Sequence, residues 1–209
     1  LDVFLPVTTS DEIGHLTQSF NSMTEELRTG SRVRDMFGKY MDPRIVEDLI
    51  DKPQLLSVDG GRQTMTILFC DMKGFTSISE GLTPTCLVNL LNRYFTLISE
   101  AVHENAGVID KFIGDAVMAY WGKPFSKESD QARLAISAVL AMKEKIAQLQ
   151  VELPELLGTR MNLPQIVVRS GIATGDVVVG NLGSEKTKNF TVIGDTVNLA
   201  SRLEGVNKI

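Results

Sequence analysis

The stretch ILFCDMKGFT at residues 67–76 ends an apolar run on an aspartate, and KFIGDAVMA at residues 111–119 sets a second aspartate beside a glycine. Residues typical of a buried strand thus bring two carboxylates, those of Asp71 and Asp115, to strand ends or tight turns. A carboxylate in such a position must reach solvent or a cation. Two of them converging from adjacent strands would suit Mg²⁺ or Mn²⁺ and favour metal-assisted chemistry on a nucleotide. Taken singly, each aspartate is also typical of a turn or a helix cap.

Strands and helices alternate around these two aspartates. The elements predicted first are a strand at 64–70, a helix from Thr83 to Gly107, a hairpin of 108–113 and 116–121 with Gly114 and Asp115 in its turn, and a helix at 128–150. Those predicted next are a loop at 151–164, a hairpin of 166–173 and 177–181 around Gly175-Asp176, a strand at 190–193 and a helix at 195–206. This βαββαβ order, with two helices over one sheet face, predicts a ferredoxin-like α+β sandwich.

The N-terminal part has a different pattern, that of a coiled-coil helix. Apolar residues spaced three and four apart form a heptad seam made of Ile13, Leu16, Phe20, Met23 and Leu27. Thr9 and Glu12 are spaced as a capping box, and the phase of the seam breaks at Gly30-Ser31. Asp42-Pro43 then predicts the start of a short helix through Ile50, followed by a linker. A seam this narrow needs partner helices.

The composition is that of an ordinary globular protein, with 209 residues, 43% of them hydrophobic, and a net charge of −5. This charge gives no reason to expect a nucleic-acid or anionic-lipid ligand. No apolar stretch is long enough to span a bilayer and no signal peptide is visible, so we expect membrane attachment only through segments upstream. Cys70 and Cys86 follow no metal-binding spacing and are typical of reduced, buried thiols. The abrupt start and end indicate a fragment of a longer protein.

Three segments together resemble the core motifs of class III adenylyl cyclases: FCDMKGFT at 69–76, DKFIGD at 110–115 and FTVIGDTVNLASR at 190–202. The resemblance covers residues 62–209. It implies that Asp71, Asp115 and the carbonyl of Met72 hold two Mg²⁺ or Mn²⁺ ions per site. It also implies that backbone N–H groups at the start of the following helix hold phosphate oxygens, a role that falls to Gly74, Phe75 and Thr76.

The same resemblance assigns the remaining site residues. Asn198 would orient the ribose, and Arg202, four residues later on one helix face, would stabilise charge developing on the phosphate. Lys111 would read adenine N1 and Thr191 would accept a hydrogen bond from the exocyclic amine, which favours ATP over GTP. The Lys/Thr combination resembles the class IIIb branch and raises the hypothesis of stimulation by bicarbonate. Lys186 is a candidate phosphate contact in a loop, although loop lysines are usually solvated.

Class III membership further implies a head-to-tail homodimer, in which the metal aspartates and the Asn/Arg/Lys set of one site come from opposite subunits. DEIGHL at 11–16 and FNSM at 20–23 resemble the C-terminal half of a HAMP module, and FGKYMDP at 37–43 resembles a transducer element. We therefore expect a HAMP segment at 1–30, a transducer and linker at 31–61, and a C-terminally truncated catalytic domain at 62–209.

This domain order implies the cytoplasmic output part of a membrane-anchored receptor that makes cyclic AMP from ATP. Two alternatives stay open: a truncated nucleotide-binding and dimerisation module with little catalysis, and a guanylate cyclase. A diguanylate cyclase and a P-loop GTPase are disfavoured, because their signature motifs are absent from the sequence.

Overall fold

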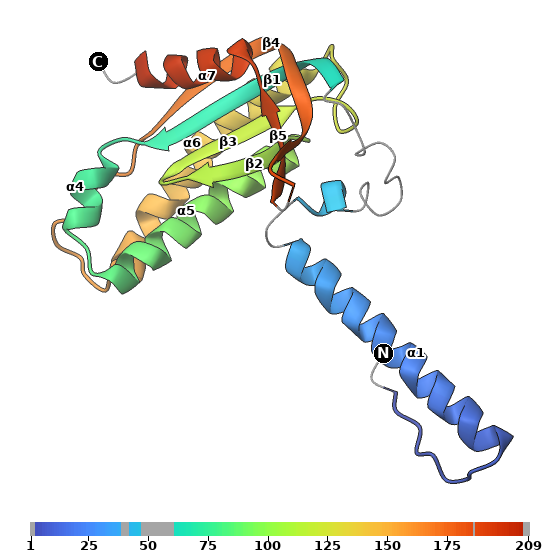
Figure 1. Ribbon diagram of the computed structural model, residues 1–209. Coiled ribbons are helices and arrows are strands. Elements are labelled where there is room, and N and C mark those ends of the chain that lie inside the picture. Colours follow the sequence, from blue (N-terminus) through green and yellow to red (C-terminus); the bar gives the residue numbers. More distant parts are fainter. Residues whose placement is uncertain (1–2, 39–41, 47–60, 186, 207–209) are drawn as a thin grey trace. The chain divides into compact units, whose positions relative to one another are not determined.

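The computed structural model describes residues 3–38, 42–46, 61–185 and 187–206 (Figure 1). The chain divides into two compact units, Leu1–Pro53 and Gln54–Ile209. None of the helices in the described ranges has the length and apolar composition that a bilayer-spanning helix requires. Lys186 and the linker at 47–60 lie outside the described residues, as does the part of the predicted short helix beyond residue 46.

The first unit is dominated by one long helix, α1 (Glu12–Phe37). Its N-cap is Asp11, whose carboxylate accepts hydrogen bonds from the N–H groups of Ile13 and Gly14. The predicted Thr9–Glu12 capping box is therefore wrong: the Thr9 hydroxyl donates to the Asp11 carboxylate at 2.7 Å, and Asp11 is two residues closer than Thr9 to the unpaired N–H groups. The Thr9 contact and these backbone bonds hold the pKa of Asp11 below its usual range.

Helix α1 continues through Gly30 and Ser31, so the predicted phase break is not a break in the helix. The heptad seam is exposed along it, with 62% of Ile13 and 67% of Leu16 accessible in the single chain. A second helical segment begins at 43–46, where Asp42 accepts a hydrogen bond from the Arg44 N–H at 3.0 Å, as the Asp-Pro pair predicted.

The second unit is built on one antiparallel sheet of five strands, in the order β2-β3-β1-β4-β5. The strands are β1 (Gly61–Met72), β2 (Val108–Ile113), β3 (Ala116–Trp121), β4 (Val168–Gly183) and β5 (Lys188–Ile193). The first four have the strand order of a ferredoxin-like sandwich, which confirms the predicted fold class, and β5 extends the sheet at the β4 edge.

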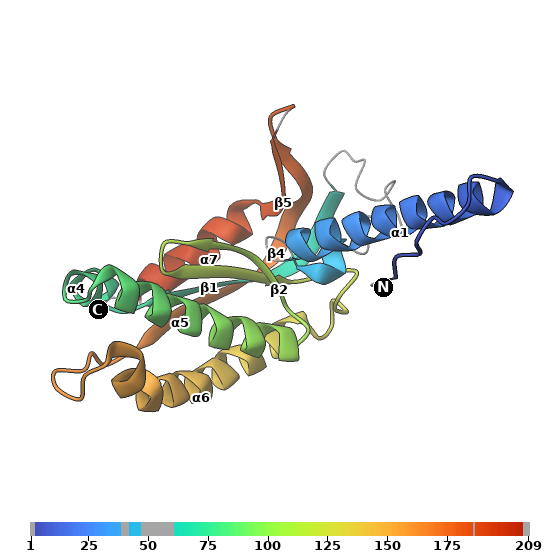
Figure 2. The ribbon, with the colours of Figure 1, turned by 90° about the horizontal axis from the view of Figure 1, so that it is seen from below.

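The helices of this unit are α4 (Phe75–Glu80), α5 (Pro84–Glu104), α6 (Gln131–Leu157) and α7 (Asp195–Val206). Helices α5 and α6 lie together on one face of the sheet and α7 lies on the other (Figures 1 and 2). The core under α5 and α6 is fully buried at residues such as Tyr94, Leu97, Trp121 and Met142. Apolar burial on this scale is the main contribution to the stability of the unit.

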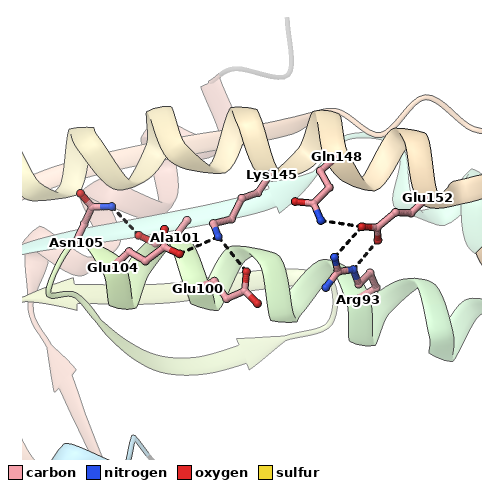
Figure 3. Close-up of polar contacts among 8 residues, drawn as sticks. All are labelled: Arg93, Glu100, Ala101, Glu104, Asn105, Lys145, Gln148 and Glu152. Carbon is pink, nitrogen blue, oxygen red and sulfur yellow. Dashed lines mark hydrogen bonds and ion pairs between the residues drawn. The ribbon is translucent and has the colours of Figure 1, made fainter.

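Ion pairs join α5 to α6 at the surface above this core (Figure 3). Arg93 binds Glu152 through two hydrogen bonds of 2.6 and 2.7 Å, and Lys145 binds both Glu100 and Glu104. The hydrogen bonds from Arg93, with a smaller contribution from Gln148, lower the pKa of Glu152 to about 2.

Strand β4 differs from the prediction, because it is one continuous strand of 16 residues instead of a hairpin around Gly175-Asp176. Gly175 pairs with Met65 and Asp176 with Thr64 on β1. The glycine serves close packing and not a turn: a Cβ on Gly175 would lie 2.7 Å from the Thr196 hydroxyl of α7.

Helix α6 also differs, since it runs to Leu157 and covers half of the predicted loop at 151–164. Leu149 and Leu153 are fully buried, and this apolar face extends the helix past Gln150 with Pro154 inside it. Gly158 then ends the helix with φ of 63°.

Candidate active site

The two aspartates that stand out in the sequence meet at one end of the sheet. Asp71 lies next to the last residue of β1, and Asp115 lies in the β2–β3 turn, where Gly114 has φ of 64°. Strands β1 and β3 are paired up to Cys70 and Val117, which brings the two positions together. The Met72 N–H donates to an Asp115 oxygen at 3.3 Å. Burial, followed by the adjacent Asp71 carboxylate, raises the pKa of Asp115 to about 6.

This pair has the chemistry of a divalent-cation site. Two adjacent carboxylates repel one another when ionised, and a Mg²⁺ or Mn²⁺ ion would remove that repulsion while accepting oxygen ligands. Within the described ranges, no group of three or more His, Cys, Asp and Glu side chains is placed to hold an ion. An ion here would therefore rely on Asp71, Asp115, backbone oxygen such as that of Met72, and ligands from the substrate.

Arg169 also contacts this candidate site, although no motif in the sequence indicated it. It lies opposite Asp71 in the β1–β4 register, and its Nη2 contacts the Asp71 carboxylate at 2.7 Å. Its Nε is also 3.2 Å from a carboxylate oxygen of Glu204 on α7. Arg169 is thus an ion-pair link between the end of β1 and the helix on that sheet face. An arginine amid strand residues is the signal that could have indicated it.

The predicted phosphate-binding residues lie at the start of α4, directly after β1. Gly74 is the N-cap residue in the left-handed conformation, with φ of 72°, and no side chain caps this helix end. Phe75 packs against the core, which fixes the helix, while Thr76 is exposed. The exposed first turn leaves backbone N–H groups available to an anion. Lys186, the fourth candidate, is outside the described residues.

Lys111 and Thr191 form a second group through a residue between them, Asp110. Thr191 on β5 donates its hydroxyl hydrogen bond to Asp110 Oδ2 at 2.8 Å, and the Lys111 ammonium lies 3.3 Å from the same oxygen. A register shift in β2 between Ile109 and Lys111 accompanies this arrangement. Strands β2 and β5 are the two outer strands of the sheet, yet they contact one another here. Asp110 is the first residue of the DKFIGD motif at 110–115, but the sequence assigned it no role.

Asn198 and Arg202 form a third group, on the exposed face of α7. Arg202 is 70% exposed and lies 3.4 Å from Asp195 in the first turn of the same helix. The structure therefore brings together Asp71 with Asp115, and Lys111 with Thr191, and presents the two α7 residues outward. An outward position is what a residue that acts in a site shared with another subunit requires.

Comparison with known proteins gives a consistent result. The family model described as the adenylate and guanylate cyclase catalytic domain matches residues 59–208, and the HAMP domain model matches residues 1–29. An adenylate cyclase of Anabaena cylindrica is 34% identical, and the match covers 95% of this chain and 39% of the relative. Adenylate cyclase 1 of Rhizobium meliloti is also 34% identical, and the match covers 100% of this chain and 30% of the relative. The chain spans about a third of the length of the curated relatives it matches.

Solved structures give a similar picture. The guanylyl cyclase Cya2 is 37% identical with a TM-score of 0.65, over 71% of this chain and 73% of its own. The adenylyl cyclase CyaB of P. aeruginosa is 36% identical with a TM-score of 0.66, over 71% of this chain and 74% of its own. A bacterial light-regulated adenylyl cyclase is 28% identical with a TM-score of 0.75, over 95% of this chain and 55% of its own.

Proposed function

The chain belongs to the family of adenylate and guanylate cyclase catalytic domains, with a HAMP segment at its N-terminus, and on this basis we propose that it converts ATP into 3′,5′-cyclic AMP and pyrophosphate. The observation that carries the proposal is the meeting of Asp71 and Asp115 at one end of the sheet. Relatives named adenylate cyclase support the enzyme class. The Lys111–Thr191 group favours ATP as the substrate, because an ammonium can donate to adenine N1.

The roles of the chain's own residues follow from where they lie. Asp71 and Asp115 would hold two Mg²⁺ or Mn²⁺ ions, which supply Lewis acidity toward the ribose 3′-hydroxyl and neutralise triphosphate charge. The first turn of α4, from Gly74 to Thr76, would bind phosphate oxygens through its N–H groups. On α7, Asn198 would orient the ribose and Arg202 would stabilise the charge that develops on the phosphate.

We propose that the site is shared in a head-to-tail homodimer, with the aspartates from one chain and the α7 residues and Lys111 from the other. The exposure of Asn198 and Arg202 supports this assignment. Mixing Asp71→Ala chains with Arg202→Ala chains tests it. Random pairing makes half of the dimers mixed, and each mixed dimer has one intact site, so about a quarter of the wild-type rate should return. Activity that stays absent after mixing would contradict sharing.

The substrate is tested by incubating the protein with Mn²⁺ and either ATP or GTP and measuring cyclic AMP, cyclic GMP and pyrophosphate. Cyclic AMP and pyrophosphate in equal amounts would support the proposal, and cyclic GMP alone would favour a guanylate cyclase. Nucleotide binding without product would favour a nucleotide-binding and dimerisation module. Rates at several bicarbonate concentrations and fixed pH test the proposed stimulation by bicarbonate.

The N-terminal unit supports a role in signalling. We propose that residues 1–30 are the C-terminal part of a HAMP module, that 31–61 are a transducer and linker, and that 62–209 are the catalytic domain. The whole protein would be a membrane-anchored receptor with this part on the cytoplasmic side. The match to the HAMP model and the exposed seam of α1 support this arrangement.

A further inference from the structure

We propose that Asp110 is a positioning residue that holds the Thr191 hydroxyl as a hydrogen-bond acceptor toward the nucleotide base, and so selects a 6-amino purine against a 6-oxo purine. The inference rests on the proposed function in one respect, the placing of the base beside Lys111 and Thr191. It adds a residue to which neither the sequence motif nor the family comparison assigns a role here.

The geometry of Asp110 is unusual for a strand residue. Its side chain has no exposed surface, and a single oxygen, Oδ2, accepts from the Thr191 hydroxyl at 2.8 Å and lies 3.3 Å from the Lys111 ammonium. Its other oxygen, Oδ1, is buried without a hydrogen-bond partner among the described residues. Burial raises the pKa of Asp110 above its usual value, while Thr191 and Lys111 oppose that rise. A buried carboxylate is costly, and an apolar residue would join two strands more cheaply.

The chemical consequence follows from the hydrogen-bond inventory of a hydroxyl. Thr191 has one O–H donor and two acceptor lone pairs, and the donor is committed to Asp110. Only lone pairs then face the base. They can accept from the 6-amino group of adenine, whereas they repel the 6-oxo group of guanine, which is itself an acceptor. A hydrogen bond to a carboxylate is stronger than one to a neutral group, so the hydroxyl is held firmly in this orientation.

Lys111 reinforces the same choice through the same oxygen. Its ammonium is anchored near Asp110 Oδ2 while 40% of the side chain stays exposed, so it can still donate to an acceptor on the base. Adenine N1 is an acceptor, but guanine N1 carries a hydrogen. One carboxylate thus sets a donor and an acceptor side by side, in the pattern complementary to the adenine edge.

The experiment compares ATP with purine riboside triphosphate, which lacks only the 6-amino group, and with GTP. Dissociation constants are measured by competition with a fluorescent nucleotide in Mn²⁺, and cyclisation rates are measured in parallel. The wild type should prefer ATP over purine riboside triphosphate by about tenfold, the value of one good hydrogen bond to a buried site. Thr191→Val and Asp110→Leu should each reduce that preference to about twofold or less, and the double variant should lose no more than either single one.

Asp110→Asn keeps the volume of the side chain and offers a neutral acceptor, so it should retain an intermediate preference of about threefold to fivefold. If Asp110→Leu does not fold, the nucleotide preference of Asp110→Asn still tests the role of Asp110. The matched control is Asp176→Asn, because Asp176 likewise accepts from a threonine hydroxyl on another strand, that of Thr64 at 3.2 Å. This control should leave the preference unchanged.

A purely structural role for Asp110 predicts a different result, in which its variants weaken binding of all three nucleotides by the same factor. An unchanged ratio of ATP to purine riboside triphosphate in Asp110→Asn and Asp110→Leu would overturn the proposal, and so would a wild type that does not distinguish them. Selective binding without cyclic product would instead refute the cyclase activity and leave the role of Asp110 supported.

Discussion

Substituting Gly171 by alanine should displace α7 from the sheet and damage both stability and activity. A Cβ at this position would lie 2.2 Å from the Ala200 carbonyl oxygen and 2.2 Å from the Glu204 backbone nitrogen. Ordinary contact begins at 3.4 Å, so the helix must move back by about 1.2 Å. The obstacles are backbone atoms that no rotamer change can remove. Overpacking of this kind costs about 1–3 kcal/mol, or about 2–4 °C of melting temperature for each kcal/mol in a chain of this size.

The displacement should have a catalytic effect beyond the loss of stability, because α7 carries Asn198 and Arg202, to which we assign contacts with the ribose and the phosphate. A shift of about 1 Å in groups that position a substrate can reduce a rate about a hundredfold. The assay combines denaturant unfolding with cyclic AMP production at a temperature where both proteins are folded. The control is Gly205→Ala on the same helix, where the new Cβ meets no atom within 4 Å apart from the adjacent backbone of its own helix, and helix propensity favours alanine. If Gly171→Ala were as stable and active as wild type, the close packing of α7 on β4 would be refuted.

Three further predictions concern other parts of the chain. Only Cys86 should react rapidly with a thiol reagent in the folded protein, because burial raises the pKa of Cys70 to about 11; two fast thiols by absorbance would contradict this. Glu152→Gln should lower the unfolding free energy by about 0.5–1 kcal/mol at pH 7. The folded pKa of Glu152 is about 2, against an ordinary 4.5, so its contribution to the unfolding free energy is fully present above about pH 4.5 and is lost as the pH falls toward 2. In urea titrations, the stability difference between Glu152→Gln and wild type should therefore be smaller at pH 3 than at pH 7. Gly30→Ala should stabilise α1 by about 1 kcal/mol, because alanine has the higher helix propensity and the new Cβ meets no atom within 4 Å apart from the adjacent backbone of its own helix. Slower amide exchange across α1 would show this, and unchanged exchange would contradict it.

Much of the fold could be predicted because local signals and tertiary structure agree. Thr83-Pro84 begins α5 as its capping pattern indicates, and the Gly114-Asp115 turn lies between β2 and β3 at the predicted bounds. The errors came where one residue type has two uses. Gly175 in a turn and Gly175 under a packed helix look alike in sequence, and only the position of α7 separates them. Pro154 suggested a loop, but the buried apolar face of α6 overrides it.

The candidate site divides in a similar way. Asp71 and Asp115 stood out because a carboxylate in an apolar strand is unexpected. Arg169 and Asp110 did not stand out, because the residue that each one contacts in the site is distant in the sequence. Arg169 is 98 positions from Asp71, and Asp110 is 81 positions from Thr191. Distances of that kind depend on sheet order and register, which a single sequence does not specify.

The uninterrupted course of β4 limits how this domain can change in length. Residues Val168–Val179 of β4 pair with β1, and Val178–Gly183 pair with β5. The two pairings therefore follow the alternation of side chains along one uninterrupted strand. Inserting one residue near Gly175 would turn every later side chain to the opposite face and carry the register of β5 with it. Insertions and deletions here should therefore be tolerated only in steps of two, whereas the exposed residues 158–162 after α6 should accept insertions of odd or even length.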